Sequence, residues 1–174
     1  MLKYKIDLIK FISNIGLKLV GKIMIIDFDF IARNQTANKK NGKNRWVAMN
    51  EKNKLLAKCI LTVNMAKIKY SIDKTYHGLI LNRYWYFSQN RSRDYDNFCA
   101  GTKYYTDALK HAKLIEDDSN RNIIQGDIWH FSGFKNEILR YVLELIETKE
   151  EFKILFEKKK EGLFINKLNL ERGL

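Results

Sequence analysis

Hydrophobic and polar positions change their spacing several times along the chain, and each change marks an expected element. Residues 2–20 carry apolar side chains at helical intervals, which predicts a short amphipathic helix. Within residues 22–30, apolar side chains instead alternate with Asp27 and Asp29, which predicts a strand with one solvent-exposed face. We expect these two aspartates to face solvent, because nothing downstream in the pattern pairs with them.

The middle of the chain is expected to form two helices around one buried strand. Residues 32–44 are basic and rich in Asn and Lys, which is typical of a loop, whereas residues 45–66 have helical spacing. Residues 79–87 are aromatic and apolar, and they predict a central strand. Further on, Asn97 is a suitable N-cap for a helix over residues 99–112.

The last third of the chain is expected to form a strand, a second strand and a helix. Residues 123–131 predict the first strand, and residues 139–147 fit a helix or a strand by periodicity alone. Thr148 and Glu151 form a capping-box pattern that starts a new helix, so the preceding segment is better placed as a strand. We expect it to form a hairpin with residues 123–131, and we expect the last helix to stop at Gly162.

The charge of the chain favours an anionic partner. The 174 residues carry a formal net charge of +12, and a hydrophobic fraction of 45% argues against global disorder. Positive charge is interleaved with Tyr, Trp and Asn, so nucleic acid is the first expectation. Compositional bias toward Lys and Asn is the alternative explanation of the charge, and it stays open.

Cysteine usage and hydropathy favour a cytoplasmic protein. Cys59 and Cys99 lie far apart without the spacing of a zinc or redox site, so reduced thiols are the simplest interpretation. No apolar run approaches the ~18 residues that cross a bilayer. Lys3, Lys5 and Asp7 interrupt any signal-peptide core. We therefore expect no membrane partner.

Acidic side chains concentrate in one segment of this basic chain. Asp94 and Asp96 are spaced i, i+2, so an extended backbone would present both carboxylates on one face, and Asp117 and Asp118 follow after one expected helix. Such hard oxygen ligands suit Mg²⁺ or Mn²⁺, which can position a water and offset charge during phosphodiester hydrolysis. The alternative is that Asp94-x-Asp96 is a solvated turn and that Asp96-Asn97 only caps a helix.

Lys103 lies one turn before Asp107 in the expected helix. The two side chains can form a helix salt bridge worth a few tenths of a kcal/mol. Alternatively, Lys103 can face the metal site, where a cation would stabilise charge that develops on the phosphorane. The spacing leaves both roles open.

Four short motifs follow one another within residues 91–119: Asp94-Tyr-Asp96-Asn97, Gly101-x-Lys103, Asp107-Ala-Leu and Ile115-x-Asp117-Asp118-Ser119. This ordered run resembles the signature of RusA-type Holliday-junction resolvases, a family of bacteria and their phages. The resemblance extends more weakly into residues 123–147. It implies an α/β fold with a mixed β-sheet flanked by helices over residues 22–147. To this nuclease domain the chain adds an N-terminal helix (residues 1–21) and a C-terminal helix and tail (residues 148–174).

The resemblance also implies an activity and a set of site residues. The expected activity is Mg²⁺-dependent endonuclease cleavage, with Mn²⁺ able to substitute, in which a homodimer resolves four-way DNA junctions by paired symmetric nicks. The residues that carry over are the catalytic and metal-binding acids Asp94, Asp96 and Asp118, the adjacent Asp117 as a further metal ligand, Lys103 as the functional lysine, and Asp107 in a supporting role.

Recognition of a junction depends on shape and backbone, so basic side chains should dominate the contacts and affinity should fall steeply with salt. The candidates for DNA binding are Lys39, Lys40, Lys43, Arg45, Arg91 and Arg93. The alternative function is a non-catalytic, basic nucleic-acid-binding protein whose aspartates are only caps and turn residues. A nucleotidyl transferase is a weaker third possibility, because no Gly-Ser phosphate loop precedes the aspartates.

Overall fold

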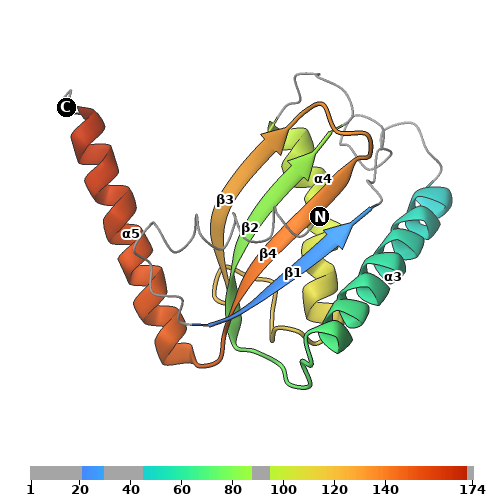
Figure 1. Ribbon diagram of the computed structural model, residues 1–174, viewed down its shortest axis with the longest axis horizontal. Helices are drawn as coiled ribbons and strands as arrows, with labels where there is room; N and C mark the ends of the chain where they lie inside the picture. Colours follow the sequence, from blue (N-terminus) through green and yellow to red (C-terminus); the bar gives the residue numbers. More distant parts are fainter. Residues whose placement is uncertain (1–20, 30–44, 88–94, 172–174) are drawn as a thin grey trace.

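The computed structural model describes residues 21–29, 45–87 and 95–171, with side chains described for residues 21–29, 49–87 and 102–161 (Figure 1). Its elements, in chain order, are β1 (Lys22–Phe28), α3 (Arg45–Lys69), β2 (Gly78–Tyr86), α4 (Tyr95–His111), β3 (Ile123–Phe131), β4 (Ile138–Ile146) and α5 (Lys149–Glu171). A mixed sheet flanked by helices confirms the α/β class. The helix expected over residues 2–20 and the loop expected at residues 32–44 lie outside the described residues.

The helices confirm one expected start and correct one expected end. The capping box of α5 is formed as expected: the Thr148 amide donates to Glu151 Oε2, and the Glu151 amide donates to Thr148 Oγ1, each at 3.2 Å. The prediction that this helix stops at Gly162 is wrong, because α5 continues to Glu171. An internal glycine costs a helix about 1 kcal/mol relative to alanine, and no proline follows to end it. Among the described residues, no helix combines the length and apolar character needed to cross a bilayer.

The four strands lie in the order β1-β4-β2-β3. Strand β4 is antiparallel to both β1 and β2, whereas β3 runs parallel to β2 at one edge. The expected hairpin between β3 and β4 is therefore wrong, because β2 lies between them. The reason is burial: β4 is buried on both faces, whereas the second half of β3 is exposed and suits an edge. The connection passes the end of β2, where the Phe87 amide donates to the Phe131 carbonyl at 2.7 Å.

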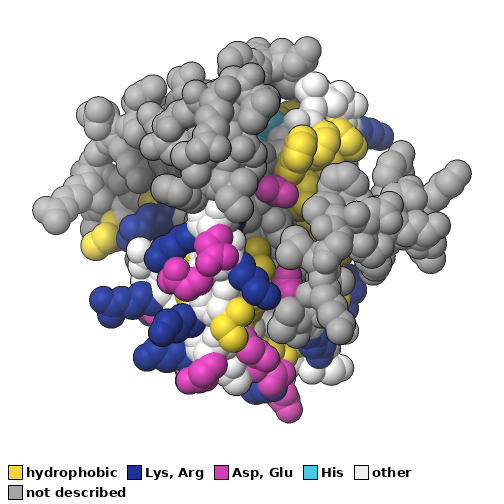
Figure 2. Space-filling model, turned by 90° about the vertical axis from the view of Figure 1, so that its left-hand side faces the viewer, with side chains coloured by type: hydrophobic (Ala, Val, Ile, Leu, Met, Phe, Trp, Pro, Cys, Tyr) yellow, Lys and Arg dark blue, Asp and Glu magenta, His cyan; other side chains and the backbone are white. Residues whose placement is uncertain are grey.

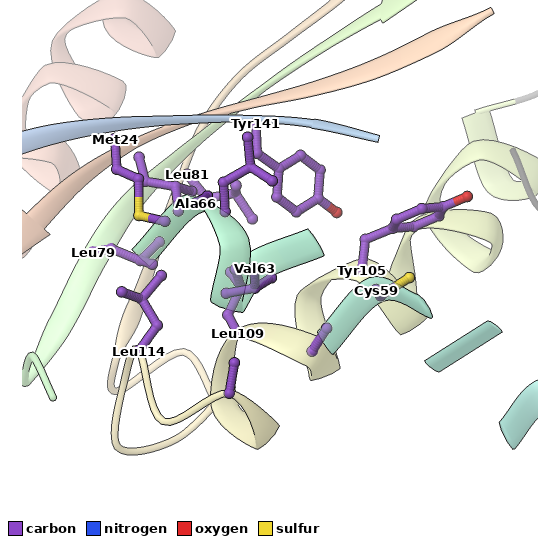
Figure 3. Close-up of a cluster of buried hydrophobic side chains, with 14 of the residues drawn as sticks. Met24, Cys59, Val63, Ala66, Leu79, Leu81, Tyr105, Leu109, Leu114 and Tyr141 are labelled. Carbon is purple, nitrogen blue, oxygen red and sulfur yellow. The ribbon is translucent and has the colours of Figure 1, made fainter. Parts of the chain in front are cut away.

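One face of the sheet packs against α3 and α4 and forms the main core (Figures 1 and 3). Side chains from the sheet and from both helices point toward one another in Figure 3; labelled among them are Met24, Leu79, Leu81 and Tyr141 from the strands, Val63 from α3 and Leu109 from α4. Cys59 of α3 is also fully buried there. This packing fixes α4 against the sheet, and α4 carries the acidic segment.

The opposite face of the sheet meets α5 at one end. Ile124, Ile146 and Phe152 form a second buried cluster between β3, β4 and α5. Farther along this face, the guanidinium of Arg140 holds the carboxylate of Asp27 through two hydrogen bonds of 2.6 and 2.8 Å. Asp27 is exposed as expected, but the expectation that no downstream residue pairs with it is wrong. The antiparallel register of β1 and β4 places the two residues opposite each other.

Candidate acidic site at the end of helix α4

Helix α4 ends in a turn that reverses the chain. Lys113 has a φ of 53°, in the left-handed region, and the Leu114 amide donates to the Leu109 carbonyl at 2.9 Å. This is the hydrogen-bond pattern of a Schellman turn. The ammonium of Lys67, in the last turn of α3, donates to the carbonyls of Ala112 and Lys113 at 2.9 and 3.2 Å. A cation at this position also offsets the negative end of the α4 dipole.

The segment that follows this turn is held at both ends. The Tyr76 amide donates to the Leu114 carbonyl at 2.9 Å. Eight positions later, the side-chain amide of the buried Asn122 donates to the His77 carbonyl at 2.5 Å. These contacts fix the loop that contains Asp118 and set it beside the last turns of α4.

The carboxyl groups of Asp107 of α4 and Asp118 of the returning loop lie near enough to each other to interact electrostatically. Burial and the neighbouring carboxyl group of Asp118 raise the pKa of Asp107, and the lysines Lys103 and Lys52 oppose the shift. Two carboxyl groups in contact cannot both ionise freely, so they tend to share a proton or a cation. Of the predicted site residues, these two are therefore brought close to each other.

Asp117 lies beside this pair and is neutralised by a lysine. Lys110 Nζ is 2.5 Å from Asp117 Oδ1 and 3.5 Å from Asp118 Oδ1. Hydrogen bonds from Lys110 and from Ser119 lower the pKa of Asp117 to about 2, so this carboxylate is ionised at neutral pH. The site therefore has an ionised carboxylate, Asp117, close to Asp107, whose pKa is raised.

The chemistry of these side chains fits a hard divalent cation. Carboxylate oxygens are the ligands that Mg²⁺ and Mn²⁺ prefer, and Mg²⁺ is commonly held by one or two carboxylates together with water and substrate phosphates. Within the part of the chain that the structure describes, no group of three or more His, Cys, Asp or Glu side chains is arranged to hold a metal ion. A cation at Asp107 and Asp118 would therefore need water or phosphate oxygens to complete its coordination.

The other acidic pair lies toward the opposite end of α4. Asp96 is in the first turn of this helix, so the expectation that it extends from a strand or loop before a helix capped by Asn97 is wrong. An acid in the first turn is itself favoured by the helix dipole. Asp96 precedes Asp107 by 107 − 96 = 11 residues, a rise of about 16 Å along a continuous helix. Metal–oxygen bonds of about 2 Å cannot join both residues of one chain to one ion.

Several predicted site residues lie outside what the structure describes. Asp94, Lys39, Lys40, Lys43, Arg91 and Arg93 are outside the described ranges, and Arg45 is described only by its backbone, as the first residue of α3. Lys103 is exposed on α4, and its charge reaches Asp107, consistent with either role expected for it. The roles of these residues stay predictions.

Sequence reasoning missed two lysines at this site. Lys110 could have been found from its i, i+3 spacing from Asp107, which is a signal that the two share a side of the helix. Lys52 has no such signal, because it comes from α3. The packing of α3 on α4 places Lys52 Nζ 5.9 Å from the centre of the Tyr104 ring and within electrostatic reach of Asp107.

A scan of the sequence against protein-family models gives no match, and a search of curated proteins gives none either.

Proposed function

We propose that this chain is a divalent-metal-dependent endonuclease that resolves four-way DNA junctions by paired symmetric nicks. The observation that carries the proposal is the proximity of the carboxyl groups of Asp107 and Asp118 in a chain of net charge +12. A protein that uses acids only for surface charge gains nothing by bringing two of them together. The ordered resemblance of residues 91–119 to RusA-type resolvases supplies the substrate and the proposed homodimer.

The proposed roles follow from the positions of the side chains. Asp107 and Asp118 bind the cation, with Asp117 beside them, and the bound Mg²⁺ or Mn²⁺ supplies charge neutralisation and a water of lowered pKa. Lys103 and Lys110 flank the acids, where ammonium groups can bind the phosphate that is cleaved.

The acids at the start of α4 need a separate role. Because one ion cannot join the two ends of this helix within one chain, Asp94 and Asp96 are proposed as a second acidic group. Asp107, for which the resemblance implied only a supporting role, is thus proposed to bind the cation directly.

The alternative is a non-catalytic DNA-binding protein, and one contact favours it. Lys110 already neutralises Asp117 and approaches Asp118, so this loop can be held by an ion pair without any metal. The two functions differ in their dependence on metal. An enzyme needs the carboxylates for cleavage, whereas a binding protein needs only its basic surface.

The test is incubation of the full chain with a labelled four-way junction and with a linear duplex, each with Mg²⁺ or with EDTA. We expect paired nicks in the junction only, abolished by EDTA. Asp118→Asn and Asp107→Asn should lose cleavage by at least about a hundredfold while binding the junction as before. Asp96→Asn tests in the same assay whether the second acidic group is needed for cleavage. Asp73→Asn, at an exposed carboxylate elsewhere, is the matched control. Cleavage that persists in EDTA or in Asp118→Asn would contradict the proposal.

A further inference from the structure

Aromatic side chains share the face of the sheet that α3 and α4 do not cover. The parallel register pairs Tyr84 with Trp129 and Tyr86 with Phe131, and side chains alternate between faces along a strand. Leu79 and Leu81, earlier on β2, belong to the main core, so the even-numbered positions of β2 lie on the opposite face. The four rings thus form one patch across β2 and β3.

The rings of this patch are open and nearly parallel. Tyr86 and Phe131 stack with centroids 5.3 Å apart and planes 16° apart, and Trp129 and Phe131 lie 6.5 Å apart with planes at 14°. Phe134, from the loop after β3, meets Tyr86 edge-on at 4.8 Å. Trp129, Phe131 and Phe134 keep 49%, 37% and 45% of their surfaces exposed. Contiguous exposed aromatic side chains of this kind usually mark a binding surface.

Basic groups border the aromatic patch. The guanidinium of Arg140 lies 5.6 Å from the centre of the Tyr86 ring, held in place by Asp27. Lys135 is exposed next to Phe134, and Lys159 of α5 is close enough to feel the charge of Asp127 on β3. In Figure 2, hydrophobic side chains gather near the top of the molecule, with Lys or Arg beside them.

We propose that this aromatic patch binds the unpaired bases of single-stranded nucleic acid. Flat exposed rings offer stacking to any base, and neighbouring cations and the net charge of +12 complement the phosphate backbone. Paired bases in a duplex hide their faces in the helical stack, so the patch selects unpaired strands. The patch lies across the sheet from α4, and the proposal does not rest on the cleavage activity proposed above.

Fluorescence of Trp129 gives a direct test with the full chain. In a Trp46→Phe background the remaining tryptophans are Trp85, which is buried, and Trp129, which is half exposed, so a base that stacks on the patch should quench a large part of the exposed tryptophan emission. The probe is a twenty-nucleotide oligothymidylate in the presence of EDTA. Its comparison ligand is an abasic oligonucleotide of the same length and charge. We expect quenching and at least about tenfold tighter binding for oligothymidylate than for the abasic strand.

Variants separate stacking from charge. Trp129→Ala combined with Phe131→Ala should weaken oligothymidylate binding by at least about tenfold without changing abasic binding, because stacking of bases on aromatic side chains contributes much of the affinity for single strands. Trp129→Phe should keep the affinity and lose most of the quenching. Met65→Ala with Ile68→Ala removes exposed apolar surface from α3 and is the matched control.

Other outcomes would overturn the proposal. Equal affinity for the two oligonucleotides would mean that only charge is recognised. Conversion of a dimer to a monomer by the double aromatic variant, without any quenching of the unaltered protein, would make the patch a contact between two copies of the chain. A Tm of the double aromatic variant that is several degrees lower, again without quenching of the unaltered protein, would mean that another part of the chain covers the patch.

Discussion

Replacing Asp107 by Asn should change the thermal stability of the protein in opposite directions without and with a divalent cation. The amide keeps the shape of the side chain, but it carries no charge. In EDTA the substitution removes the repulsion between two half-buried carboxylates. With Mn²⁺ it removes a ligand, so the sign of the effect separates a metal site from a structural acid pair.

The magnitude without metal is bounded by the repulsion of two neighbouring carboxylates. Two like charges about 4 Å apart repel by about 4 kcal/mol at an effective dielectric constant near 20. Asp107 is only partly buried and two lysines offset its charge, so solvent screening reduces the expected gain to about 1 kcal/mol. For a chain of this length, 1 kcal/mol corresponds to roughly 2–4 °C in Tm.

The dependence on pH has a defined sign. Folding raises the pKa of Asp107, so the protonated side chain favours the folded state. This contribution is complete below the ordinary carboxyl pKa and is lost as the pH rises through the raised value. The difference in Tm between Asp107→Asn and the unaltered protein in EDTA should therefore be near zero in acid and grow toward neutral pH.

Differential scanning fluorimetry in EDTA and in Mn²⁺ measures both effects. A cation at a hundred times its Kd stabilises by about 2.7 kcal/mol, so the unaltered protein should gain roughly 5–10 °C in saturating Mn²⁺. Asp107→Asn should start higher in EDTA and gain little. Asp73→Asn should follow the unaltered protein in both conditions. The reasoning fails if Mn²⁺ leaves the unaltered protein unchanged, or if Asp107→Asn lowers Tm in EDTA.

Three further predictions concern the stability of the fold. Thr148→Ala removes the capping box of α5 and should lower the free energy of unfolding by about 1 kcal/mol in urea denaturation. Thr62→Ala, inside α3, should cost little, and equal losses would contradict the capping role. Gly78→Ala should cost about 2 kcal/mol, because its Cβ would lie 2.5 Å from the Asn122 carbonyl oxygen; an unchanged urea midpoint would refute this. Burial raises the pKa of the Cys59 thiol to about 12, so in a Cys99→Ser background a thiol reagent at pH 8 should label the protein only after unfolding. Rapid labelling of the folded protein would show that the thiol is accessible.

Local patterns in the sequence were sufficient for the type of most elements. Alternation identified β1, and the capping box identified the start of α5 through the two reciprocal bonds of Thr148 and Glu151. Both signals are short-range, because side-chain period and helix capping depend on residues a few positions apart. The error at Asn97 concerns a helix start, where boundaries commonly vary by about one or two residues, whereas α5 continues past Gly162 because one internal glycine costs a helix only about 1 kcal/mol.

Pairing between distant segments was decided only by the tertiary structure. No pattern within β3 or β4 predicts that β2 lies between them, because the order of the strands depends on how deeply each of the four is buried in the folded protein. Likewise, the sequence identified the acids of the 91–118 segment but not which of them meet. The left-handed turn at Lys113 and the anchoring of Asn122 bring Asp118 to Asp107, and the length of α4 keeps Asp96 away. The type of each helix or strand is set by neighbouring residues, whereas contacts between distant residues depend on the packing of the whole chain.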